Sequence, residues 1–159
     1  WFLLWGGEGL DPSLPISVNG ALLQPGQSFM VDMGGNFYGY MGDMSRVFSI
    51  GKLPEKAYVA HQVCLDIQEA VVEKAKPGAV CEDLYNLAID IVTKRLCRQL
   101  YGSHSKSQVY RSWHRTGNQW NAGAGSTHEA GAGTGHGLCL EPKIVLLGIG
   151  PVGIETLGL

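Results

Sequence analysis

Four carboxylates lie inside apolar runs of the sequence, where charged side chains are unusual. Asp32 stands in "MVDMG" and Asp43 in "YMGDM", while Glu141 stands in "LCLEP" and Glu155 in "GIET". Any one of them alone could be a strand-end residue that pairs with a lysine or caps a turn. Together they indicate a shared cation, because clustered carboxylates repel one another unless a metal neutralises them. Oxygen ligands favour manganese, magnesium or a similar divalent ion over a thiolate-type zinc site.

Two antiparallel hairpins are predicted to position these carboxylates. Residues 27–50 contain β-prone runs on either side of "GGN", which we interpret as a turn. They predict two or three antiparallel strands, with Asp32 and Asp43 on neighbouring strands. "KIVLL" reads as another strand, "GIGP" as a turn and "VGIETL" as the partner strand. Glu141 and Glu155 would flank this second hairpin.

Apolar residues at helical spacing predict two helices between the hairpins. The first is expected to begin at Pro54, in the favoured first position, and to stop at Pro77–Gly78. The second follows directly. The core-facing residues are Val59, Val63, Ile67, Ala70 and Val71 in the first helix, and Leu84, Leu87, Ala88, Ile91 and Val92 in the second.

The composition fits one globular domain. A chain of 159 residues with 45% hydrophobic and 16% charged residues can bury a core and is not typical of disorder. The net charge of -2 gives no electrostatic footprint for nucleic acid, and no apolar run reaches membrane-spanning length. The four cysteines lie far apart without a CxxC pair, so we expect reduced thiols and a cytoplasmic protein. Because the first residue is Trp1, we expect the chain to be part of something longer.

Two long motifs carry a resemblance to a known family. "FMVDMGGNFYGYMGDMSRVFSIGKLP" resembles the first metal motif of the pita-bread metallopeptidases, which include methionine aminopeptidase, aminopeptidase P, prolidase and the metal-free relative creatinase. "LEPKIVLLGIGPVGIET" is similar to the final metal-binding hairpin of that family. The resemblance implies a truncated α+β pita-bread fold, with helices on the outer face of a curved antiparallel sheet. Residues 1–159 would be a partial catalytic domain, family-like at 1–100 and 140–156.

The resemblance also implies roles for the carboxylates. Asp32 would bind one metal ion and Asp43 would bridge two, while Glu141 would bind the second ion and Glu155 would bridge. The implied cofactors are two divalent ions, with manganese, cobalt or zinc expected. A hydroxide generated by the two ions would attack the N-terminal peptide bond of a short peptide, and the catalytic Glu141 would help to manage protons. The presence of the carboxylates argues against a metal-free, creatinase-like site.

The branch of the family and the partners are further expectations. "GDMSR" with Arg46 resembles the Xaa-Pro branch, although many aminopeptidase P relatives carry arginine at the position of Gly153. The implied partner is a short peptide substrate; we expect neither nucleic acid nor membrane, and the resemblance allows a homodimer. The alternative is a non-catalytic pita-bread module that holds peptides or protein partners without cleaving them. A third interpretation is an unrelated β-rich structural domain with scattered carboxylates.

The family also needs a histidine ligand, and residues 101–139 are anomalous at the place where it should occur. They are rich in Gly, Ser, Thr, His and Trp, without helical or alternating periodicity. His136 lies in "TGHGLCLEPK", only five residues before Glu141, so its use as the ligand would require deletion of the intervening loop. His114 is the other candidate replacement.

A shifted reading frame would explain residues 101–139. With synonymous codons chosen to favour it, reading residues 101–120 one base later gives "MGHTAKARFIGHGIGLEING", which contains the histidine motif of the family. Trp113 followed by His114 forces a glycine in that frame whatever codons are used. We therefore expect this segment to be out of frame and His136 to be a chance product. The strands that carry the histidine should then fail to pack, and the chain as written should bind metal poorly.

Overall fold

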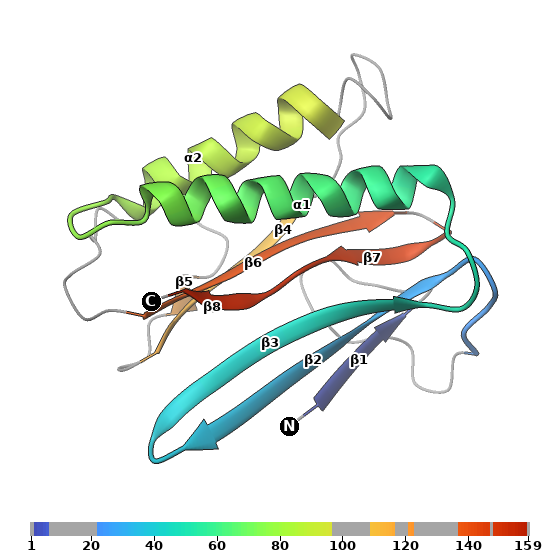
Figure 1. Ribbon diagram of the computed structural model, residues 1–159, viewed down its shortest axis with the longest axis horizontal. Coiled ribbons are helices and arrows are strands. Elements are labelled where there is room, and N and C mark those ends of the chain that lie inside the picture. The colour runs from blue at the N-terminus through green and yellow to red at the C-terminus, as the bar shows by residue number, and fades with distance from the viewer. Residues whose placement is uncertain are drawn as a thin grey trace.

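The structure is a computed structural model in which two antiparallel sheets and two helices are described (Figure 1). It describes residues 2–6, 22–96, 109–116, 121–122, 137–146 and 148–158. Within these ranges, no helix is both long and apolar enough to cross a membrane.

The first sheet has the order β1-β2-β3, with β1 at Phe2–Gly6, β2 at Ser28–Phe37 and β3 at Tyr40–Ser49. The predicted hairpin is present, but its turn is not at "GGN", which lies within β2. The chain reverses at Tyr38 and Gly39, whose φ angles are 51° and 87°. Positive φ at both central residues is the geometry of a two-residue hairpin turn that matches strand twist. The prediction that "GGN" forms the turn was therefore wrong.

The second sheet has the order β5-β4-β6-β7, and β8 also pairs with β6. The strand bounds are β4 at Val109–Thr116, β5 at Asn121–Ala122, β6 at Gly137–Leu146, β7 at Gly150–Gly153 and β8 at Thr156–Gly158. The partner strand predicted from "VGIETL" is thus interrupted between β7 and β8, and both pieces pair with β6.

The presence of strand β4 contradicts an expectation. Residues 101–139 were predicted to contain no strand that could pack. Eight residue pairs join β4 to β6 in antiparallel register. Ladder hydrogen bonds join backbone groups, so an available strand edge can be paired without alternating side chains. "VYRSWHRT" also contains β-prone valine, tyrosine and tryptophan. The reading frame itself stays a prediction.

Helices α1 at Glu55–Lys74 and α2 at Cys81–Val92 lie on one side of β6 and β7 (Figure 1). Pro54 is the residue before α1 and not its first turn, and the helix ends three residues before Pro77. Six of the predicted core residues, Val63, Ile67, Val71, Leu84, Ala88 and Val92, are buried with Ile144, Leu146 and Val152 in one core. Leu87 and Ile91 pack against this core partly buried, and Val59 and Ala70 are only half-buried.

Ser28 joins the two sheets at a close contact. Its backbone N–H donates to the Ile149 carbonyl at 2.8 Å, and its hydroxyl donates to the Pro151 carbonyl at 2.7 Å. Gly150, with φ of 122°, lies so near that a Cβ there would be 2.5 Å from the Ser28 carbonyl oxygen. Only glycine fits this conformation and this distance. The contact holds the strand of Asp32 against the strands that flank Glu155.

Candidate metal centre

Asp32 reaches the interior because of the alternation along β2. Ser28, Met30 and Asp32 are buried, while the residues between them are partly exposed. Successive side chains of a strand point to opposite faces, so Asp32 shares the inward face of the core residue Met30. The central position of β2, between β1 and β3, satisfies the backbone around this carboxylate.

Glu155 is positioned by the interruption between β7 and β8. Its backbone N–H donates to the Ser45 carbonyl of β3 at 3.4 Å. The Arg46 guanidinium donates through Nη1 to the carbonyl oxygens of Ser45 and Glu155, each at 2.8 Å. A planar cation that bridges two carbonyls orients both segments at once. Arg46, which is part of the motif that resembles the Xaa-Pro branch, therefore also fixes the backbone of Glu155, a candidate ligand.

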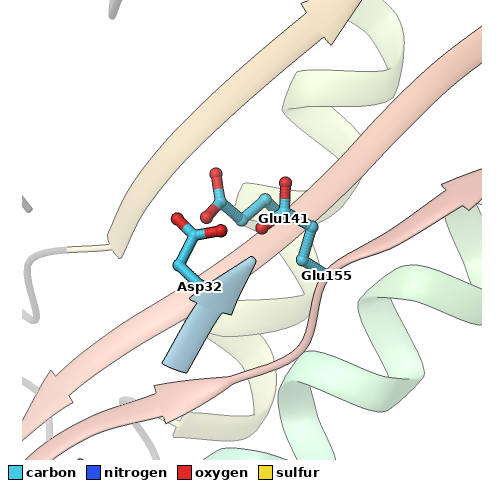
Figure 2. Close-up of side chains that lie close together, drawn as sticks. All are labelled: Asp32, Glu141 and Glu155. Carbon is cyan, nitrogen blue, oxygen red and sulfur yellow. The ribbon is translucent and has the colours of Figure 1, made fainter. Parts of the chain in front are cut away.

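Asp32, Glu141 and Glu155 converge, although they come from separate strands and a loop (Figure 2). One carboxylate oxygen from each lies within 4.8 Å of the other two. All three residues are buried, with exposed fractions of 6%, 7% and 1%. We call these three residues the carboxylate cluster. Three oxygen donors at such separations form the donor set that a hard divalent cation prefers.

Asp43 lies beside the carboxylate cluster but is not one of the three residues that converge. It pairs with Gly34 across the hairpin, two residues along β2 from Asp32. The pKa of Asp43 is raised to about 6, first by burial and then by the charges of Glu155 and Asp32, while Lys143 and the Met44 amide act to lower it. Its Oδ1 is buried without a hydrogen-bond partner among the described residues. A buried acceptor of this kind suits a cation ligand.

Lys143 is the site residue that the sequence interpretation missed. Its side chain is 2% exposed, and its ammonium contacts the Glu141 carboxylate. The same nitrogen lies 3.9 Å from Asp32 Oδ2 and 4.0 Å from Glu155 Oε2. The sequence contained a signal that could have identified Lys143. Side chains two residues apart on a strand share one face, so the lysine of "EPK" lies on the same face of β6 as Glu141.

Gly153 faces Lys143 across the β6–β7 ladder and has no room for a side chain. A Cβ at Gly153 would lie 2.4 Å from the Pro142 carbonyl oxygen and 2.9 Å from Lys143 Cα. Those atoms are backbone and cannot move aside cheaply. This crowding is a physical reason why this chain has glycine where many aminopeptidase P relatives carry arginine.

Gly153→Ala should therefore lower the free energy of unfolding by about 1–3 kcal/mol, the usual cost of overpacking. The measurement is urea denaturation followed by circular dichroism. Gly42→Ala is the matched control, because Gly42 also lies in an antiparallel strand but its Cβ would meet nothing nearer than the Gly35 carbonyl at 4.0 Å. Equal midpoints for the two variants would contradict the close contact at Gly153.

The structure describes only one of the two histidine candidates, His114. His136 is outside the described residues. His114 belongs to β4, where its register partner is Cys139. The residue that pairs with Glu141 is Ser112. In the shifted frame quoted above, codon 112 is the one that encodes the histidine of "GHGIG", so that frame would place the histidine directly across from Glu141.

Residues 6–156 match the model of metallopeptidase family M24. The chain belongs to this family. An Xaa-Pro dipeptidase of Lactobacillus helveticus is 28% identical over 155 residues, which cover 96% of this chain and 40% of the relative. This M24 chain thus spans about 40% of the length of such curated relatives.

Solved structures agree with the assignment to M24. A dipeptidase from Pyrococcus horikoshii superposes with a TM-score of 0.76 at 23% identity, covering 98% of this chain and 42% of that one. A prolidase from the same organism gives 0.73 at 25% identity, covering 97% and 43%. The predicted membership in the pita-bread metallopeptidases, on the Xaa-Pro side, is confirmed, and so is the truncated α+β fold.

Proposed function

We propose that the protein to which this M24 chain belongs is a metal-dependent peptidase that releases the N-terminal residue of short peptides, with proline preferred in the second position. The convergence of Asp32, Glu141 and Glu155 in a buried cluster is the observation that carries this proposal. The relatives named Xaa-Pro dipeptidase support the choice of substrate class.

The donors fit two divalent ions, with manganese, cobalt or zinc as the candidates. Asp32 and Glu141 would each hold one ion, and Asp43 and Glu155 would bridge them. The buried Oδ1 of Asp43 and the exclusively oxygen donors of the carboxylate cluster support this fit. When bound, such ions activate water as a nucleophile and polarise the peptide carbonyl.

Positioning of a ligand, proton transfer and exclusion of water depend on side chains of this chain. Arg46 holds the Glu155 backbone in place, so that this carboxylate does not have to be ordered when a substrate arrives. Glu141 is the proposed proton carrier, because a carboxylate beside the reacting group can take a proton and return it to the leaving amine. Burial of the carboxylate cluster excludes bulk water and strengthens each electrostatic interaction within it.

The test is peptide turnover by the in-frame, full-length protein. We expect hydrolysis of Xaa-Pro dipeptides at least about tenfold faster than of matched Xaa-Ala dipeptides, a discrimination of about 1.4 kcal/mol. A chelator should abolish the activity, and manganese or cobalt should restore it. Turnover that persists in excess chelator would contradict the metal-dependent mechanism, and equal rates on both dipeptides would contradict the proline preference.

A non-catalytic pita-bread module is the second candidate, and the position of Lys143 favours it. A lysine ammonium among the three carboxylates compensates part of their negative charge without any metal. Such a module would bind the same dipeptides without cleaving them. Calorimetric binding of Xaa-Pro peptides with no product after prolonged incubation would select this candidate.

Location and assembly belong to the same proposal. We infer a cytoplasmic protein because Cys64 and Cys81 are free thiols, as in proteins of reducing compartments. A homodimer is the proposed assembly, and light scattering of the full-length protein measures it directly.

A further inference from the structure

The ammonium of Lys143 lies where the three carboxylates converge. It contacts Glu141 and lies about equally far from the other two members, 3.9 Å from Asp32 and 4.0 Å from Glu155. The side chain is 2% exposed, so the charge is removed from water. A buried lysine is costly unless carboxylates compensate it, and here three carboxylates surround one ammonium.

The fold directs this side chain into the carboxylate cluster. Lys143 follows Glu141 by two residues on β6, which places both on one face of the strand. Gly153 is its register partner on β7, and a Cβ at Gly153 would lie 3.1 Å from Lys143 Cγ. The missing side chain at Gly153 therefore leaves the space that the stem of the lysine occupies.

A lysine ammonium and a divalent ion compete for the same oxygens. The carboxylates that could coordinate a metal are the ones that surround Lys143 Nζ. Two cations held a few ångströms apart in a buried site repel strongly. A metal can bind there only if the ammonium leaves the carboxylate cluster, which breaks the contact with Glu141.

We propose that Lys143 is a tethered cation that occupies the carboxylate cluster and competes with divalent metal, so that removal of its charge tightens metal binding. The proposal rests on the proposed function in taking this cluster as the metal site. It assigns to Lys143 the control of metal affinity, and to Gly153 the space that admits the lysine.

The manganese affinity of the 159-residue chain as written, measured by titration calorimetry, tests this inference. Lys143→Met keeps the stem length and removes the charge, and we expect it to bind manganese at least about tenfold more tightly than the parent chain. Lys143→Arg keeps the charge and should bind no more tightly than the parent. Lys74→Met is the matched control, because Lys74 is exposed at the end of α1 and its loss should leave the affinity unchanged.

Thermal unfolding supplies a second readout that does not depend on activity. Without its ammonium the carboxylate cluster is uncompensated, so Lys143→Met should melt lower than the parent in chelator and recover when manganese is added. A Lys143→Met chain that stays unfolded in saturating manganese would overturn the proposal, since metal would then be unable to replace the ammonium.

Two further outcomes separate this inference from the proposed function. Equal manganese affinity of the parent and Lys143→Met would overturn the competition, and so would the absence of binding by both. The proposed function would be unaffected by either result, because it is decided by turnover and chelation of the in-frame, full-length protein. Loss of metal dependence in that assay would refute the proposed function instead.

Discussion

Restoring the reading frame across residues 101–139 is expected to raise manganese affinity by at least about 100-fold over the chain as written, more than the usual effect of a single supporting residue. The register of β4 gives the reason, since it pairs Ser112 with Glu141. In the shifted frame, read with the codons chosen to favour it, that position would carry histidine, a nitrogen ligand delivered by a strand next to the carboxylate cluster. A strand-borne ligand is oriented before the metal arrives, which is the condition for tight binding.

Single substitutions in the chain as written control this experiment. Ser112→His alone should recover part of the affinity, because it supplies the ligand without the rest of the restored strand. His136→Ala should leave the affinity unchanged, since His136 is expected to be a product of the shifted codons. Loss of manganese binding in His136→Ala would show that the written histidine is the ligand and that the shifted-frame hypothesis is wrong.

Asp43→Ala in the in-frame, full-length protein is expected to lower peptide turnover by more than about 100-fold, beyond the range of substitutions outside the coordination sphere. Asp43 is the proposed bridge between two ions, so its removal should loosen both. Asp32→Ala removes a ligand of one ion and should cost less. The measurement is turnover of an Xaa-Pro dipeptide together with the number of bound metal ions by elemental analysis.

Asp90→Ala controls for the loss of one negative charge, because Asp90 is an exposed residue of α2 whose ion-pair partner, Lys94, is exposed as well. Such surface pairs contribute little, so turnover and metal content should remain unchanged. If Asp43→Ala retained both metal ions and full turnover, the bridging role would be refuted. Asp43 would then lie outside the metal site of the active enzyme, as it lies outside the carboxylate cluster here.

Local patterns in the sequence predicted the two helices and the β2–β3 hairpin, but not the position of its turn or strand β4. Helical spacing placed Val63, Ile67 and Val71 on the buried face of α1, because a 3.6-residue period depends only on the helix itself. Alternation in β2 likewise predicts which side Asp32 takes. The identity of the carboxylates, with their apolar neighbours, indicated a cation before any geometry was known.

Tertiary structure alone decided which groups meet. The carboxylate of Asp32 lies near that of Glu141 because Ser28 joins the two sheets. No local sequence period encodes proximity between residues more than a hundred positions apart. The same packing places the Lys143 ammonium among the carboxylates, and the absence of a side chain at Gly153 leaves space for the lysine stem. Side-chain alternation tells which face a residue takes, whereas convergence depends on sheet register and on how closely two backbones approach.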